Sequence, residues 1–259
     1  MDNALVFEGI PGVYRLERAV LLATPGRVGA VSAAAPGLPV TTVAPASLRA
    51  RTDPASRLAE MAALELAAGH PLPGDPARRG VFVASRRGNQ ESVRRFATSL
   101  TNSRRSPVTF SVAGYNIVAQ SAARALPAHG PSVVLAGQRA SLDGALLLGA
   151  LRLRSRAIDT AVVGLASWVP GADPAVPGEG LALLTTLVRA GALPAAEEPG
   201  LVRSRAAFAP APSGAGAADG LSPEDLAALR RIGGVAGRNL GRDLALAPVE
   251  APAVLVGAR

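Results

Sequence analysis

The sequence predicts an α/β protein with a largely buried mixed sheet and helices on both of its faces. Amphipathic helical segments alternate along the chain with short, continuous apolar runs that are typical of buried strands. Hydrophobic residues make up 49% of the 259 residues, enough for a sizeable core, whereas aromatic residues make up only 3%. We therefore expect a core built from Ala, Leu and Val.

The N-terminal part predicts a short strand followed by a segment with weak signals. Residues 3–8 read "NALVFE" and end at a Gly-Pro turn, whereas the Pro- and Gly-rich residues 10–45 leave strands and loops open. A helix is predicted over residues 52–70, because Thr52 or Asp53 can cap it and Pro54 suits its first position.

The rest of the first 190 residues alternates between helical and extended patterns. Apolar residues recur at helical spacing in the helices, and the strands are short apolar runs between turn signals. In order, we expect a strand at 80–85, a helix at 89–102, an extended segment at 106–112, a helix at 116–126, a strand at 132–136, a helix from 142 to 153, a strand at 160–165 and a strand at 178–188, with a helix as the alternative for the last.

The composition changes near residue 190, which predicts a domain over residues 1–190. Residues 191–220 are rich in Pro, Ala and Gly and are expected to be a linker. In the last segment, 221–259, Ser222 and Pro223 are typical of a helix start, and residues 251–259 are a candidate final strand.

The residue types exclude several kinds of chemistry. The chain has no Cys and no Lys, so it has no thiolate nucleophile, no disulfide, no Schiff base and no P-loop lysine. The only histidines, His70 and His129, lie in Pro-flanked loop sequences. Because no further ligands stand at a suitable spacing, we expect neither a metal nor a cofactor.

The formal net charge of +8, carried by 27 arginines against 19 acidic residues, favours an acidic partner. The arginines are scattered in pairs with few aromatic residues between them, so we expect no nucleic-acid partner, and solvated arginines are an equal alternative to a binding patch. No apolar run reaches the roughly 18 to 20 residues of a membrane span, and Asp2 stands where a secretory signal carries basic residues. We therefore expect no membrane partner and a cytoplasmic protein.

The strand at 132–136 leads through a tight turn into the helix that starts at Leu142. Many enzymes mount a nucleophile at such a turn, because the free N–H groups of the helix N-terminus stabilise an anion. Here the turn holds Gln138 and Arg139, and neither side chain is a nucleophile.

The order of these segments resembles the N-terminal half of the β-ketoacyl synthases. The segments are "DPASRLAEMAALELA", "RGVFVASRRGNQESVRRFATSL", "SPVTFSVAGYN", "AIDTAVVGLAS" and "PGEGLALL", together with the spacing from Asn116 to Gly130, Pro131 and Ser132. The resemblance covers roughly residues 50–190. It implies a thiolase-like layered fold of which this chain holds the N-terminal half only, a truncated ketosynthase.

The departures from the family imply a chain without catalysis of its own. In active ketosynthases the turn holds a Cys four residues before a Leu; Gln138 occupies that position before Leu142, and Arg139 is the alternative alignment. The family's His pair and Lys belong to its second half, and residues 190–259 are too short and linker-rich to supply it. We therefore expect no catalytic residue in this chain.

A Gln at this turn resembles the chain-length factors of type II polyketide systems, which are inactive partners of ketosynthases. "QRASLDGAL" is similar to their pattern at Gln138, Leu142 and Asp143. This implies a subunit that pairs with a full-length ketosynthase and acts with an acyl carrier protein in polyketide or fatty-acid-like elongation. The uncharged strand Ser132, Val133, Val134, Leu135 and Ala136 is expected to pair across the dimer.

Other functions remain open at this point. A homodimeric scaffold that binds a carrier protein or an acyl chain is the main alternative, and a malonyl decarboxylase of the Gln-type loading ketosynthases is a weaker one. An independent enzyme using Ser141 or Asp143 has no recognisable His base. Asn116 has the simpler interpretation of a residue that caps the helix or turns the chain before it.

Overall fold

The computed structural model describes residues 4–7, 10–48, 52–68, 70–101, 113–114, 116–136, 142–171, 176–191, 202–204, 229–230 and 232. The expected extended segment at 106–112, the turn at 137–141 and the expected strand at 251–259 lie outside these ranges.

The described strands form one eight-stranded mixed sheet in the order β5-β4-β6-β7-β2-β1-β8, with β3 paired to β2. Strands β5, β4 and β6 run parallel, β6, β7, β2 and β1 are successively antiparallel, and β8 and β3 run parallel to β1 and β2. Their bounds are β1 Ala4–Phe7, β2 Ile10–Ala23, β3 Val40–Thr42, β4 Arg79–Ser85, β5 Ser132–Ala136, β6 Thr160–Val169, β7 Glu179–Gly191 and β8 Val202–Ser204.

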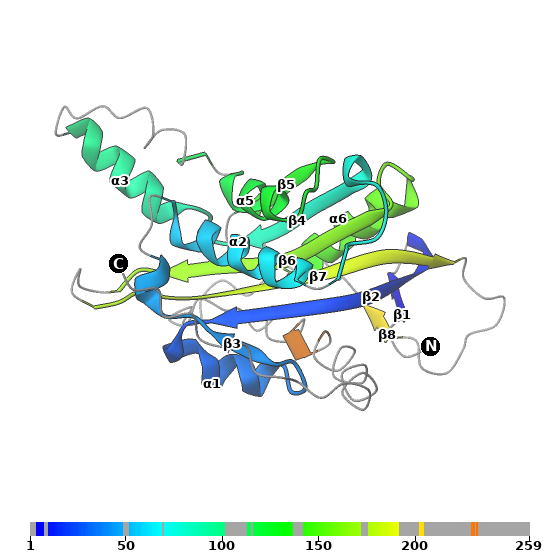
Figure 1. Cartoon of the computed structure of the whole chain (residues 1–259), viewed down its shortest axis with the longest axis horizontal. Helices are drawn as coiled ribbons and strands as arrows, with labels where there is room; N and C mark the ends of the chain where they lie inside the picture. Colours follow the sequence, from blue (N-terminus) through cyan, green and yellow to red (C-terminus); the bar gives the residue numbers. More distant parts are fainter. Residues whose placement is uncertain are drawn as a thin grey trace.

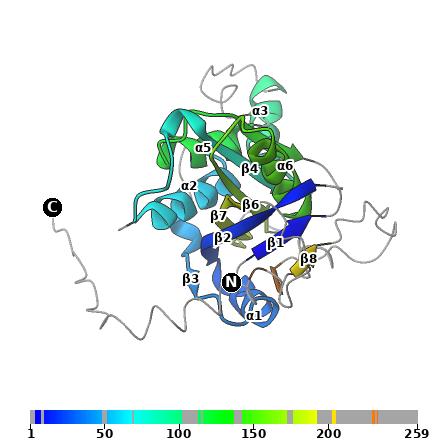
Figure 2. The same ribbon diagram turned by 90° about the vertical axis from the view of Figure 1, so that its right-hand side faces the viewer.

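Helices cover both faces of the sheet, so the domain has three layers (Figure 1). Helices α2 and α5 pack on one face, and α1 and α6 pack on the other, as Figure 2 shows from the side. The bounds are α1 Pro25–Ala34, α2 Pro54–Ala67, α3 Gln90–Thr101, α5 Ile117–Ala125 and α6 Leu142–Arg154, with 3-10 turns η1 Pro45–Leu48 and η2 Pro76–Arg78.

The central strands are apolar on both faces because both faces are covered. In β4, Val81 and Val83 join the core under α2 and α5, whereas Phe82 and Ala84 join the core under α1 and α6. All four side chains are fully buried. The expectation of a buried mixed sheet with helices on both faces is confirmed, as is the choice of strand for β7.

The start of α2 follows the predicted capping pattern. Asp53 is the N-cap, its carboxylate accepts a hydrogen bond from the Ala55 N–H at 2.9 Å, and Pro54 occupies the first helical position. The cap is Asp53 and not Thr52.

The segment at 10–45 contains strands, which its sequence left open, and also the helix α1, which was not expected. β2 alternates buried Tyr14 and Leu16 with exposed Arg15 and Glu17, because one end of this long strand is covered on one face only. The helix α1 follows directly, with Pro25 in its first turn.

The chain after residue 190 also contributes to the domain. Three residues of the segment expected to be a linker form β8, which pairs with β1. Leu229 and Ile232 are buried in the core on the side of α1 and α6.

Candidate functional site

Strand β5 lies at one edge of the sheet, and within the described residues it pairs only with β4. Its first four side chains are half-buried and Ala136 is exposed, whereas nearly every residue of the neighbouring β4 is buried. The residues expected to pair across a dimer thus form a mostly apolar strand whose second edge is open within the described part of the chain.

Gly130 and Pro131 seat the start of this strand against β4. The Gly130 N–H donates to the carbonyl oxygen of Arg79 at 3.0 Å, and the Val81 N–H donates to the carbonyl oxygen of Pro131 at 2.9 Å. A Cβ at position 130 would stand 2.5 Å from the Arg79 oxygen, so this close approach requires glycine.

Asn116 and Ser132 meet although 16 residues separate them. The Asn116 amide donates to the Ser132 hydroxyl at 3.5 Å, a long hydrogen bond. Asn116 precedes α5, but its side chain makes no capping hydrogen bond. Asn116 thus occupies the N-cap position of α5 without a side-chain capping bond, and its amide reaches the start of β5.

Leu142 and Asp143 begin α6 beyond the turn. Leu142 is fully buried and anchors the helix in the core, and Asp143 lies in the first turn, where a carboxylate is favourable to the helix dipole. Gln138 and Arg139 lie outside the described residues, so their side chains remain sequence-based expectations.

The ladder between β4 and β5 fixes which backbone groups of β5 face outward. In a parallel pair, alternate residues direct both N–H and C=O to the same neighbour. Because Pro131 accepts from Val81, residues 131, 133 and 135 face β4. The backbone groups of Ser132, Val134 and Ala136 consequently point to the open edge.

The two histidines do not join this region. His70 lies beside Arg18, with 3.5 Å between the Nδ1 and Nη1 atoms, and His129 is exposed. Across the described ranges, no three side chains of His, Asp or Glu gather closely enough to hold a metal ion. In the same ranges no helix has both the length and the apolar character to cross a membrane.

The structure also reveals a cluster of charged residues that sequence reasoning missed. Arg78, Arg156, Asp159 and Arg189 line one pocket at the opposite end of the parallel strands. Arg78 and Asp159 stand 81 residues apart, so no local spacing signals their contact.

The described architecture agrees with a known protein family. The family model "Beta-ketoacyl synthase, N-terminal domain" matches residues 39–173, just over half of the chain. No curated protein matches the chain by sequence. The expected thiolase-like fold, in its N-terminal half, is confirmed by this match and by the mixed three-layer architecture.

Several solved structures share part of the shape. The ishigamide ketosynthase/chain length factor is 22% identical, with 54% of this chain and 45% of that chain covered and a TM-score of 0.45. The ketosynthase ApeO with its chain length factor ApeC, from Xenorhabdus doucetiae, is 18% identical, with 69% and 79% covered and a TM-score of 0.47. This chain spans less than half the length of the ishigamide chain.

Proposed function

Because the chain belongs to the β-ketoacyl synthase family through its N-terminal domain, we propose that it is a non-catalytic subunit of the chain-length-factor kind. In this role it pairs with an active ketosynthase during polyketide or fatty-acid-like elongation on an acyl carrier protein. A homodimeric scaffold with the same fold is the alternative that the experiment below separates from it.

The observation that carries the proposal is the open edge of β5. Its side chains are uncharged and, apart from Ser132, apolar, its outward N–H and C=O groups belong to Ser132, Val134 and Ala136, and among the described strands β4 alone pairs with it, on its other side. An uncharged edge strand favours pairing with a strand of another chain. Pairing there would extend the sheet across two subunits.

The residue inventory supports a role without chemistry of its own. The chain holds no Cys for a thioester and no Lys, and neither Gln138 nor the alternative Arg139, the two residues expected at the position of the nucleophile, is a nucleophile. A Gln amide forms hydrogen bonds but cannot carry an acyl group. The reaction would therefore belong to the partner chain, and the region of Gln138 would help to bound its acyl tunnel.

The positive net charge supports the carrier protein as the second contact. The formal charge of +8 creates a field that attracts an acidic protein and speeds its encounter with the complex. Raising the salt concentration should weaken this contact more than the apolar pairing through β5.

The test is co-expression of the tagged chain with each full-length ketosynthase of its own genome. The proposal expects a 1:1 complex by light scattering and a changed product length or rate of that ketosynthase. A homodimer that binds none of them would favour the scaffold, and a monomer that changes no ketosynthase product would overturn both.

Two substitutions at one position locate the contact. Val134→Pro removes an N–H that faces the open edge and leaves the ladder to β4 intact, so it should abolish the complex while the chain stays folded by circular dichroism. Val134→Ala keeps that N–H and should retain the complex. Equal complex formation by the proline variant would contradict pairing through β5.

A further inference from the structure

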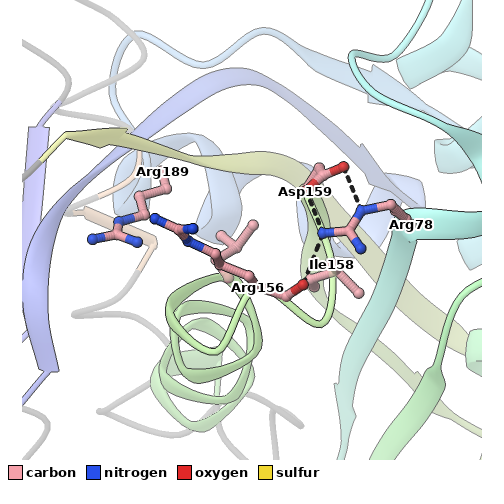
Figure 3. A pocket seen from close by; sticks show the side chains of 6 residues that line it. Arg78, Arg156, Ile158, Asp159 and Arg189 are labelled. Atoms are coloured by element: carbon pink, nitrogen blue, oxygen red, sulfur yellow. Dashed lines mark hydrogen bonds and ion pairs between the residues drawn. The ribbon is translucent and has the colours of Figure 1, made fainter.

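A pocket of about 340 Å³ opens where β4 and β6 begin and where α6 and β7 end. Six residues line it, namely Arg78, Leu153, Arg156, Ile158, Asp159 and Arg189 (Figure 3). Because β4, β5 and β6 are parallel, this end of the sheet is opposite to the turn that follows β5. The pocket is therefore separate from the site proposed above.

The residues that line the pocket include one carboxylate, and it already has an ion-pair partner. Arg78 donates two hydrogen bonds to the Asp159 carboxylate, from Nε at 2.6 Å and from Nη2 at 2.7 Å. Its Nη2 also donates to the carbonyl oxygen of Arg156 at 2.7 Å. The hydrogen bonds from Arg78 lower the pKa of the Asp159 carboxyl below its ordinary value. This forked pair is thus neutral as a unit.

Two further guanidinium groups have no such partner in the described part of the chain. Within the described residues, neither Arg156 nor Arg189 lies within ion-pair distance of a carboxylate. Figure 3 shows the side chain of Arg156 extending toward Arg189 across the pocket. These two positive charges face the same pocket, and the nearby carboxylate is already paired with Arg78. The pocket therefore has a local excess of positive charge.

The positive charge at this end of the molecule also acts on a buried tyrosine. Burial raises the pKa of the Tyr14 phenol, while the positive charges of Arg189 and Arg154 oppose that rise. Arg152 and Arg154, in the last turn of α6, add to the same end of the molecule. The excess charge is therefore a property of the whole end of α6 and not of one side chain.

The backbone conformation of Arg156 is the most informative feature. Its φ is +55°, and it occupies the position after the α6 C-cap where helices usually place glycine. The N–H of Arg156 donates to Leu153 at 3.1 Å and the N–H of Ala157 donates to Arg152 at 3.2 Å, which is the Schellman pattern. An arginine in this left-handed conformation costs stability that glycine would not.

The same turn removes an obstacle to anion binding at a helix C-terminus. The free carbonyls there carry partial negative charge and normally disfavour anions. The carbonyls of Arg152 and Leu153 are capped by the Schellman hydrogen bonds, and that of Arg156 accepts from Arg78. The negative charge that these carbonyls present to the pocket is thus reduced, which favours the guanidinium groups as binding groups.

We propose that this pocket binds the phosphate group of a small phosphate ester between Arg156 and Arg189. Planar guanidinium groups bind phosphate oxygens through paired, charge-assisted hydrogen bonds. Leu153 and Ile158, both nearly fully buried, form an apolar floor for the carbon part of the ester. The volume lies within the range of small-molecule pockets. This proposal does not depend on the proposed pairing with a ketosynthase.

The test is calorimetric titration of the full chain with phenyl phosphate, inorganic phosphate and benzoate. Phenyl phosphate should bind with a dissociation constant of about 1 mM or tighter, inorganic phosphate more weakly and benzoate most weakly, since a dianion uses both arginines. Binding should weaken as the pH falls below about 6, where the phosphate ester gains a proton.

Three variants distinguish a site from general charge attraction. Arg156→Gly and Arg189→Gln should each weaken phenyl phosphate binding by about tenfold or more, whereas Arg124→Gln, which removes an exposed charge on α5, should change it less than about twofold. Arg156→Gly should also melt at the same or a higher temperature, because glycine suits the positive φ.

Three results would overturn the proposal. They are no phenyl phosphate binding at 10 mM (a concentration about tenfold above the expected constant), unchanged binding by Arg156→Gly, and an equal loss in Arg124→Gln.

Discussion

Asp53 shows how one buried side chain can serve two helices. It is 1% exposed, one carboxylate oxygen accepts from the Ala55 N–H of α2, and the other accepts from the Ser92 N–H of α3 at 3.2 Å. Burial raises the pKa of its carboxyl, and the hydrogen bonds from Ser92, Ala55 and Ser56 oppose the rise. Desolvation therefore exceeds the stabilisation that these donors give to the charge.

Replacing Asp53 with Ala should lower the free energy of unfolding by about 1 to 3 kcal/mol, because it leaves two buried N–H groups without acceptors. Urea denaturation at pH 7 measures the change. Asp75→Ala is the matched control, since Asp75 makes the same bond to Ala77 at 2.9 Å in an exposed turn. A loss at position 75 as large as that at position 53 would contradict the role of burial.

The stability of the domain should depend on pH through the titration of Asp53. Because its folded pKa lies above the ordinary 3.8, the native state holds the proton more tightly than the unfolded state. The resulting stabilisation is complete below pH 3.8 and is lost as the pH rises through the folded pKa. Asp53→Asn cannot titrate, so the stability of the wild type relative to this variant should fall over that interval in urea denaturation. A constant difference would disprove the raised pKa.

At the scale of elements, Thr24 joins the end of β2 to the start of β7. Its N–H donates to the carbonyl oxygen of Gly180 at 2.9 Å, and its hydroxyl accepts from the Gly180 N–H at 3.0 Å. Thr24 is fully buried and precedes α1, yet its hydroxyl does not cap that helix. The side chain instead bonds to the start of β7, at the point where β2 ends and α1 begins.

Thr24→Val should destabilise the domain by about 1 to 3 kcal/mol, because it keeps the shape and leaves the buried Gly180 N–H without an acceptor. Thr24→Ser keeps the hydroxyl and should cost about 1 kcal/mol or less, for one lost methyl group. Thermal unfolding of the two variants measures the difference. Equal losses would mean that packing, and not the hydrogen bond, is what Thr24 provides.

The elements were predictable to different degrees for physical reasons. Helix α2 is predicted by Asp53, Pro54 and a regular apolar spacing, and all of these signals are local in the sequence. Helix α1 has only three buried residues and a weaker pattern, and its position depends on packing against β2, β3 and β7. The edge position of β5 follows from the sheet order, which no local pattern encodes.

At the scale of the whole molecule, residues far beyond the predicted domain boundary complete the core. Leu229 is fully buried and Ile232 is 2% exposed, both in the core shared with α1 and α6. This packing joins Leu229 and Ile232 to the core of the domain.

Leu229→Ala should therefore lower the free energy of unfolding by about 2 to 4 kcal/mol through the lost apolar burial and the cavity that remains. The neighbouring Arg230 is exposed, and Arg230→Ala should change stability by less than about 0.5 kcal/mol. Urea denaturation compares the two variants. A Leu229 variant as stable as the wild type would mean that the core does not depend on this segment.

The sequence by itself determined the α/β class, the helices α2, α5 and α6 and the strands β4, β5 and β6, because apolar period, caps and turn residues act over a few neighbours. It also determined the absence of Cys and Lys. Tertiary structure alone decided that Asn116 meets Ser132, that β5 is an edge, and that Arg78 and Asp159 pair beside Arg156 and Arg189. These contacts join residues 16 to 81 positions apart, and only the packing of the sheet and its helices brings such residues together.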